Sequence, residues 1–144
     1  MRNFYFIKKR FKFTSKLIMI ERYSRKELRD IWSDYNKYSI WLEIELAAAQ
    51  AMEKYKLIPK GVTKKVRAKA KINVRRVSEI EKKVKHDVIA FLTSITERVG
   101  SDAKYLHKGM TSSDVLDTCF NLQLKQSGEI LIKDLDLLLS SIKK

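Results

Sequence analysis

The sequence predicts an all-α protein, and three observations support that prediction. Only four glycines and one proline occur among 144 residues, so few tight turns can form, and β-sandwiches, barrels and glycine-rich nucleotide folds are disfavoured. Hydrophobic residues make up 44% of the chain and charged residues 33%, a balance typical of amphipathic chains that fold. Apolar residues also recur at steps of three, four and seven, the spacing of helical faces.

Residues 1–18 differ from the rest of the chain. They contain five aromatic residues, six basic residues and no acidic residue, and they have hardly any helical period. A secretory signal needs an apolar core of about 7–15 residues, whereas the run from Phe4 to Ile7 has four. We expect Met19 to be the natural start and residues 1–18 to be an upstream extension. A basic targeting arm is the alternative.

The segment after Met19 predicts two helices. Ser24 and Glu27 have the spacing of a capping box, which predicts a short helix that continues to about Asp34. A second helix is expected over 38–56, and Pro59 ends that region. The broad apolar face of this second helix consists of Ile40, Trp41, Ile44, Ala48, Ala51, Met52 and Tyr55.

Three further helices are expected in the middle of the chain. Two are short and basic, over 62–71 and 73–84. A third runs over 87–99, because Gly100 is suited to the position just after a helix end. Residues 101–110 follow as an ordered loop. The predicted buried residues of the 73–84 helix are Val77, Ile80 and Val84.

A long helix is expected from the cluster 111–114 to Lys144. The cluster supplies hydroxyl caps and an acid at the helix start, and no proline follows. About 30 helical residues span about 45 Å, more than a domain of this size covers alone. We therefore expect a bundle helix packed on further chain or other subunits, and a truncated protein. Its apolar stripe is Leu116, Phe120, Leu124, Leu131, Leu135, Leu138 and Ile142, widened by Val115, Cys119, Leu122, Ile130 and Leu137.

The charge of the chain is strongly positive. Thirty-one Lys and Arg residues against 17 Asp and Glu residues give a net charge of +14, and ten of the bases lie between Lys64 and Lys85. This favours an anionic partner, which could be nucleic acid, a membrane surface or a phosphorylated metabolite. A solvated lysine-rich surface explains it equally well. No apolar run reaches 18 residues, so no membrane span is expected.

The sequence contains too few ligands for a metal cluster. One cysteine, Cys119, excludes a disulfide framework, and with two histidines it is too little for a zinc site. We expect no metal and no cofactor. The sequence also has no phosphate-binding loop and no nucleophile–base–acid series.

Both histidines fall at helix junctions, and this gives the first indication of chemistry. His86 precedes one expected helix, and His107 lies just before the hydroxyls of Thr111 and Ser112. A histidine alone is usually structural, and hydroxyls at a helix start usually only cap it. Together, however, imidazoles, a helix N-terminus and Gly109 predict a pocket for a carboxylate or phosphate, with groups that transfer protons near neutral pH.

Four segments occur in one order that is specific to a family. They are ERYS at 21–24, IPK at 58–60, KHDVIAF at 85–91 and HKGMTSSDVLDT at 107–118. In this order they resemble the N-terminal part of the adenylosuccinate lyase family, within the fumarase/aspartase superfamily. The resemblance covers nearly everything from Met19 to Lys144. The last segment alone indicates only the superfamily, whereas the first and third indicate the purine-pathway member.

The resemblance implies a fold and an activity. The fold is an N-terminal helical domain over 19–110 that leads into the first long helix of a bundle over 111–144, in a cytoplasmic homotetramer. The activity is the β-elimination of fumarate from adenylosuccinate, giving AMP, and from the succinyl-carboxamide ribotide of purine biosynthesis. A base removes a proton beside a carboxylate, and the dianionic carbanion expels the amine, which an acid protonates.

The resemblance also assigns roles on the nucleotide side of the substrate. Arg22 and Tyr23 match residues that hold the nucleotide, and a guanidinium suits its phosphate. Lys85, His86 and Asp87 match a substrate-binding trio, in which His86 assists proton transfer or orients the acid. Lys85 stands where the family often has arginine, so a bidentate contact there becomes a point-charge contact.

On the dicarboxylate side, Thr111 and Ser112 match hydroxyls that bind the substrate, and His107 lies beside them as a second catalytic candidate. We expect His86 and Thr111 to converge in space. The family's general-acid histidine and its serine base would both follow after Lys144, so the polypeptide is expected to be inactive alone. In the family, three subunits contribute to each site.

Three alternatives remain open. Another superfamily lyase, such as argininosuccinate lyase, or a cycloisomerase would share the last segment, but it would not explain Arg22 and Tyr23. A small basic helical nucleic-acid-binding protein would explain the charge, but it would leave the apolar stripe and the histidine segments unexplained. A non-catalytic remnant that mixes with full-length subunits is the third.

Overall fold

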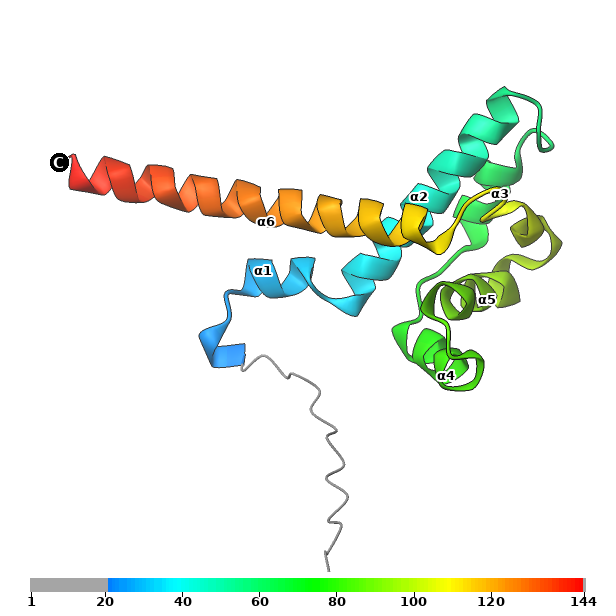
Figure 1. The fold of residues 1–144 in the computed structure, drawn as a ribbon, viewed down its shortest axis with the longest axis horizontal. Coiled ribbons are helices and arrows are strands. Elements are labelled where there is room, and N and C mark those ends of the chain that lie inside the picture. The colour runs from blue at the N-terminus through cyan, green and yellow to red at the C-terminus, as the bar shows by residue number, and fades with distance from the viewer. Residues whose placement is uncertain (1–20, 144) are drawn as a thin grey trace, which may run out of the picture.

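The structure is a computed structural model, and it describes residues 21–143. The extension predicted over 1–18 lies outside this range. The described part of the chain is helical and contains no strand, which confirms the all-α prediction (Figure 1). Its elements are η1 (Glu21–Tyr23), α1 (Lys26–Ile31), α2 (Asp34–Lys54), α3 (Val62–Lys69), α4 (Val74–Val84), α5 (Asp87–Val99), η2 (Gly100–Tyr105) and α6 (Ser112–Ile142).

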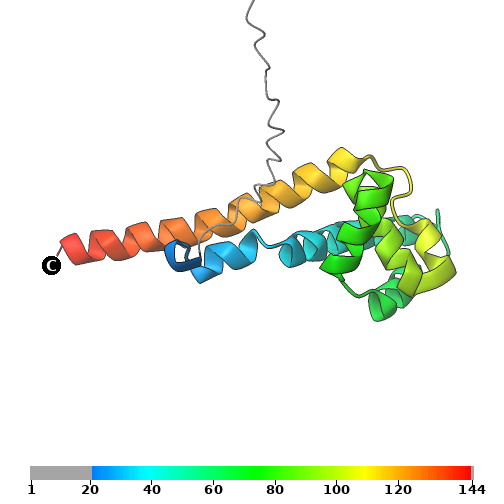
Figure 2. The same cartoon turned by 90° about the horizontal axis from the view of Figure 1, so that it is seen from below.

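The helices form a compact head and a long projecting arm (Figures 1 and 2). Helices α3, α4 and α5 gather with η2 at one end of the molecule, where α4 packs on α5, and α3 contacts α2, α5 and η2. The arm is α6, which packs on α2 near its start and on α1 further along, and then runs on beyond them. Among the described helices, none is long and apolar enough to cross a membrane.

Several helix ends lie where the local sequence predicts them. Helix α5 spans Asp87–Val99, and Gly100 follows at φ 79°, a backbone conformation that glycine adopts readily. Helix α6 begins after Thr111, which occupies its N-cap position. The predicted loop at 101–110 is partly helical, because η2 occupies Gly100–Tyr105.

The boundary between the first two helices was predicted wrongly. Helix α1 begins at Lys26, one residue later than a Ser24 cap implies, and its N-cap residue Arg25 makes no side-chain cap bond. The Ser33 hydroxyl accepts a hydrogen bond from the Asn36 backbone N–H at 3.1 Å. Because Ser33 caps the next helix in this way, α2 begins at Asp34, four residues earlier than expected.

Three aromatic rings join α2 to α5 in the core. The rings of Tyr38 and Trp41 meet edge to face at 5.2 Å, those of Trp41 and Phe91 at 5.4 Å, and Phe91 stacks on Tyr38 at 5.8 Å. Such offset and edge contacts add to the hydrophobic stabilisation of the buried area. This cluster fixes the arrangement of the head against α2.

Three predicted core residues are exposed instead. Ala51 lies in the last turn of α2, Tyr55 caps that helix, and Val84 ends α4. A residue at a helix end lies past the neighbour that covers the middle of the helix, so a periodic pattern overestimates its burial. The residues of α2 that are buried are Tyr38, Ile40, Trp41, Glu45, Leu46 and Ala49.

The apolar stripe of α6 is only partly covered. Val115, Cys119, Gln123 and Ser127 are buried, whereas most of the leucines beyond them are exposed. Two of the buried residues are polar because they bridge to the α1–α2 junction: Gln123 Nε2 donates to the Ile31 carbonyl at 2.8 Å, and Ser127 Oγ accepts from Trp32 Nε1 at 3.1 Å. Six of the exposed apolar residues of α6 follow the predicted stripe, and we call them the α6 apolar face: Phe120, Leu124, Leu131, Leu135, Leu138 and Ile142.

Two bidentate ion pairs connect neighbouring helices of the head. Arg67 of α3 binds Glu43 of α2 at 2.6 and 2.7 Å, and Arg76 of α4 binds Glu97 of α5 at 2.9 and 2.6 Å. Hydrogen bonds from Arg67 and Arg76 hold the pKa values of Glu43 and Glu97 below their ordinary value of 4.5. Part of the basic run at 64–85 is therefore paired inside the molecule.

These pairs predict a loss of stability in acid. A carboxyl group whose pKa is lower in the folded state stabilises the protein above its unfolded-state pKa, and this contribution is lost as the pH falls through the folded value. In urea unfolding at pH 7 and about pH 3.5, the double variant Glu43→Gln/Glu97→Gln is expected to lose less stability on acidification than the wild type. Glu129→Gln, which alters a carboxylate without an ion pair in the described structure, should match the wild type; equal acid sensitivity in all three would contradict the prediction.

Candidate functional site

The first group of predicted site residues lies at the junction of α4 and α5. Lys85 is the C-cap of α4 in the left-handed conformation, at φ 56°, and His86 is the N-cap of α5. His86 Nδ1 accepts a hydrogen bond from the Ile89 backbone N–H at 3.4 Å, and Asp87 Oδ1 accepts from Val88 N–H at 2.7 Å. Because Nδ1 accepts, the neutral ring carries its proton on Nε2. The exposed neutral imidazole can therefore donate a hydrogen bond from Nε2.

The second group surrounds the loop between η2 and α6. His107 lies in a turn, and its neighbour across the fold is Glu45 of α2. The His107 backbone N–H donates to Glu45 Oε2 at 2.6 Å, and His107 Nδ1 lies 2.7 Å from Glu45 Oε1. The Glu45 side chain has no exposed area, whereas that of His107 is 18% exposed. The loop histidine is thus attached to the core by a buried carboxylate.

The hydroxyls of this group stand at the start of α6. Thr111 is the exposed N-cap residue, Ser112 is the first helical residue, and Asp114 Oδ2 accepts from the Thr111 backbone N–H at 2.8 Å. This bond is the reciprocal half of a capping box. The first-turn N–H groups and the positive end of the helix dipole make this end of α6 suitable for an anionic group.

The third group, Arg22 and Tyr23, is apart from the other two. Both side chains are exposed in η1, and the Arg22 guanidinium lies 4.8 Å from the centre of the Tyr23 ring. Both views place η1, the dark-blue turn before α1, at the far end of α1 and well away from the head (Figures 1 and 2). A single chain therefore does not bring the predicted nucleotide-holding pair to the histidines.

No hydrogen bond or ion pair within residues 21–143 joins one of these groups to another. The groups are assembled locally, each at a helix end. The predicted convergence of His86 and Thr111 is not made by a direct contact in this chain and stays a prediction.

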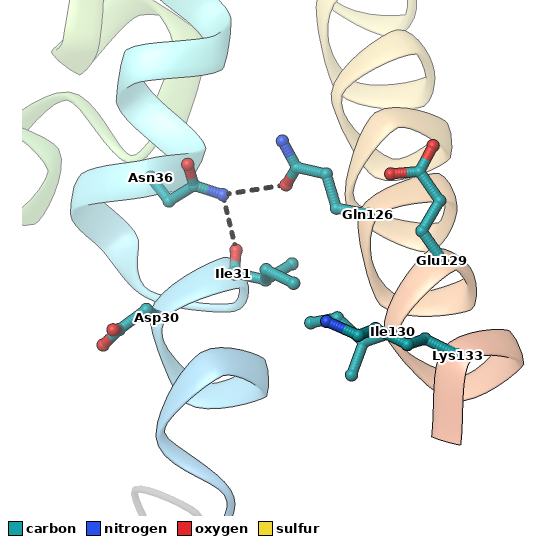
Figure 3. Close-up of a pocket in the computed structure, with 7 residues that line it drawn as sticks. All are labelled: Asp30, Ile31, Asn36, Gln126, Glu129, Ile130 and Lys133. Carbon is teal, nitrogen blue, oxygen red and sulfur yellow. Dashed lines mark hydrogen bonds between the residues drawn. The ribbon is translucent and has the colours of Figure 1, made fainter. Parts of the chain in front are cut away.

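A hollow between the α1–α2 junction and α6 contains none of the predicted site residues (Figure 3). Asn36 Nδ2 reaches across it, donating to the Ile31 carbonyl at 2.8 Å and to Gln126 Oε1 at 3.4 Å. The lining mixes both charges with apolar groups, and no cluster of like charge faces it. Its residues are Asp30, Ile31, Asn36, Gln126, Glu129, Ile130 and Lys133.

Glu45 is the functional candidate that the sequence pattern did not reveal. Its position gave a signal, because Trp41 and Ala49, four residues before and after it, belong to the buried side of α2. An acid between two buried positions must have a partner inside the protein. The sequence could not identify that partner, since His107 is 62 residues away.

The described residues contain no group of three or more His, Cys, Asp and Glu side chains placed to hold a metal ion. Cys119 is buried in α6, and burial raises the pKa of its thiol. A buried thiol with a raised pKa is a poor nucleophile. The candidate chemistry of the described chain therefore lies with the histidines, the hydroxyls and the cations.

Comparison with known proteins gives three similarities. The model of a family described as "Lyase" matches residues 21–144. The chain is 47% identical over 118 residues to the adenylosuccinate lyase of Staphylococcus saprophyticus, covering 82% of this chain and 27% of that protein. The crystal structure of a fumarate lyase from Mesorhizobium sp. BNC1 aligns with a TM-score of 0.62 and 25% identity, over 68% of this chain and 24% of that one. The chain spans about a quarter of the length of these relatives.

Proposed function

Because the chain belongs to the lyase family of the fumarase/aspartase superfamily, we propose that it forms the N-terminal part of an adenylosuccinate lyase. The reactions are the elimination of fumarate from adenylosuccinate, giving AMP, and from the succinyl-carboxamide ribotide, both in purine biosynthesis in the cytoplasm. The single observation behind this proposal is the 47% identity to an adenylosuccinate lyase across 82% of the chain. The helix-end positions of the histidines and hydroxyls support it.

The chemistry requires groups that stabilise a developing dianion, and the second group supplies them. The hydroxyls of Thr111 and Ser112, together with the first-turn N–H groups of α6, bind the dicarboxylate end of the substrate. Donors fixed before the reaction stabilise the transition state without reorganising, and this is commonly the largest contribution to catalysis. His107 lies four residues before Thr111 and borders the same anionic group.

The first and third groups act on the remainder of the substrate. His86 donates a hydrogen bond from Nε2 in its neutral form and so orients the acid that protonates the leaving amine, or it assists that protonation as the imidazolium. Lys85 supplies a point charge beside it, and Asp87 completes this substrate-binding trio. Arg22 and Tyr23 bind the nucleotide.

The separation of the groups supports a site shared between subunits. Arg22 and Tyr23 belong to η1, which lies at the far end of α1 from the head, the histidines and hydroxyls stand elsewhere in the same chain, and the α6 apolar face is uncovered. We propose a homotetramer built on α6, in which the arm of one subunit packs on others and brings a second subunit's groups to the site. Within a subunit, residues 19–110 serve as the helical domain and 111–144 as the first part of the bundle.

The chain alone is expected to have no turnover. It spans 27% of the similar adenylosuccinate lyase, and the general acid and the serine base that the resemblance implies belong to the unmatched part. The residues described above bind and orient the substrate, and the elimination also requires the general acid and base of that unmatched part.

A chimera tests the proposal. Residues 21–144 replace the matching segment of the S. saprophyticus adenylosuccinate lyase, and fumarate release is measured with adenylosuccinate, the succinyl-carboxamide ribotide and argininosuccinate. We expect turnover of the first two and none of the third. Turnover of argininosuccinate alone would identify a different superfamily lyase. Retention of DNA by the 144-residue chain, lost with added salt and without affinity for AMP, would instead support a nucleic-acid-binding protein.

Replacing Arg22 is expected to weaken nucleotide binding in the chimera. The exposed guanidinium of η1 makes a charge-assisted, bidentate contact with the phosphate, so Arg22→Ala should raise KM at least about tenfold and leave kcat within about twofold. Arg22→Lys keeps the positive charge but loses the two-pronged guanidinium, so its KM should lie between those of the wild type and of Arg22→Ala. Steady-state kinetics measure both constants, and an unchanged KM in Arg22→Ala would contradict the assignment.

A further inference from the structure

We infer that Glu45 is a positioning residue: its buried carboxylate fixes His107 with the proton on Nδ1, so that Nε2, as an acceptor, is the nitrogen that this histidine offers to a substrate. The inference deepens the proposed function and rests on it for the identity of that substrate. The contact between Glu45 and His107 itself does not depend on any function.

The burial of Glu45 shows that its carboxylate is committed to this contact. Its side chain has no exposed area, and it lies on α2 among the apolar side chains of the core. A carboxylate removed from water is strongly destabilising unless it is fully hydrogen-bonded. Both of its oxygens face His107, Oε2 at 2.6 Å from the backbone nitrogen and Oε1 at 2.7 Å from Nδ1.

The two contacts determine where the ring proton lies. The backbone N–H of His107 can only donate, so it occupies Oε2. An ionised carboxylate has no proton to give, so Nδ1 must donate to Oε1. This leaves Nε2 with its lone pair. The carboxylate also stabilises the imidazolium that forms when Nε2 accepts a proton.

The backbone of the loop gives independent support. His107 has φ 58°, in the left-handed region that side-chain-bearing residues seldom adopt. Such a conformation persists where the surroundings determine it from more than one side. Glu45 binds this residue at the main chain and at the ring, and Met110 N–H donates to the His107 carbonyl at 3.4 Å. One carboxylate therefore fixes both the backbone conformation of the loop and the orientation of the His107 ring, just before Thr111, the N-cap residue of α6.

The two histidines are consequently held in opposite tautomers. His86 accepts at Nδ1 from the Ile89 N–H and keeps its proton on Nε2, whereas His107 donates at Nδ1 and keeps Nε2 free of a proton. One ring is prepared to donate and the other to accept. The chain has two histidines in total, so both can be observed together by NMR.

Ring-nitrogen NMR tests the inference directly. In the ¹⁵N-labelled 144-residue chain at about pH 8, where an ordinary imidazole is neutral, long-range ¹H–¹⁵N spectra report which nitrogen carries the proton. We expect protonated Nδ1 for His107 and protonated Nε2 for His86, with His86→Gln identifying the signals. A protonated Nε2 on wild-type His107 would overturn the inference, without any variant at Glu45.

Glu45→Gln should reverse the tautomer of His107. The carboxamide has one acceptor oxygen, which the backbone N–H occupies, and an NH₂ group that can only donate to Nδ1. The proton then moves to Nε2, and the protonated and unprotonated ¹⁵N signals exchange. Glu43→Gln alters an exposed carboxylate two residues away on α2, and it should leave the spectrum as in the wild type. An unchanged tautomer in folded Glu45→Gln would overturn the inference.

Kinetics in the chimera separate this inference from the proposed function. Glu45→Gln is expected to lower kcat at least about tenfold, and Glu43→Gln to leave it within about twofold. If the chimera turns over adenylosuccinate and Glu45→Gln leaves kcat unchanged, the positioning role fails. If the spectra show the expected tautomers but the chimera turns over no adenylosuccinate, the proposed function fails and the arrangement of Glu45 and His107 stands.

Discussion

Thr111→Ala and His86→Gln are each expected to lower kcat of the chimera at least about tenfold. Thr111 contributes a hydroxyl at the start of α6, where the dicarboxylate binds, and loss of one donor to a developing anion typically costs about a hundredfold or more. His86 contributes the Nε2 proton at the start of α5, and general acid–base groups contribute on the order of a hundredfold or more. The oligomer should persist in both variants.

Each of these residues also caps a helix, so the experiment needs variants that keep the cap. Thr111→Asn and His86→Asn retain an acceptor suited to an N-cap but remove the hydroxyl and the imidazole. We expect them to be as slow as Thr111→Ala and His86→Gln, and Thr111→Ser to be close to the wild type. Full activity in the asparagine variants, with thermal unfolding unchanged, would remove these side chains from the mechanism.

The second large effect is expected on the α6 apolar face. Leu135 is 58% exposed and lies seven residues from Ile142 and four from Leu131, so the three share one side of the arm. If this face packs on another subunit, Leu135→Glu places an unpaired charge in an apolar interface. Association of the chimera should weaken at least about a hundredfold, which sedimentation at several protein concentrations measures.

A matched control lies on the same helix. Ser140 is exposed, and its hydroxyl donates to the Asp136 carbonyl of the preceding turn. Five residues from Leu135, it lies on the opposite side of the helix from Leu131, Leu135 and Ile142. Ser140→Glu adds the same charge to the same part of α6 and should leave the oligomer intact. Equal association of Leu135→Glu, Ser140→Glu and the wild type would show that the α6 apolar face is not the subunit interface.

Local sequence determined several helix ends, including the start of α6 that carries the hydroxyls of the candidate site. The start of α6 follows from Thr111 and Asp114, whose bond spans three residues, and the end of α5 follows from Gly100. The start of α2 was placed wrongly, because Ser24 and Ser33 both precede helices and the pattern alone did not show where α1 stops. Caps are formed between residues a few positions apart, so a sequence predicts that a helix exists better than it predicts the residues at which the helix begins and ends.

Only the tertiary structure decided which side of each helix is buried and which distant groups meet. The apolar stripe of α6 predicted a packed helix, but the side against α2 includes Gln123 and Ser127, because those side chains bridge to the α1–α2 junction. The resemblance identified His107 but not its partner, since the bond to Glu45 exists only once α2 has packed beneath the loop. By itself the sequence determined the helical class, the family resemblance and those helix ends, such as the start of α6, that depend on neighbours in the chain. The orientation of the catalytic candidates depends on contacts between distant segments, and packing alone creates those.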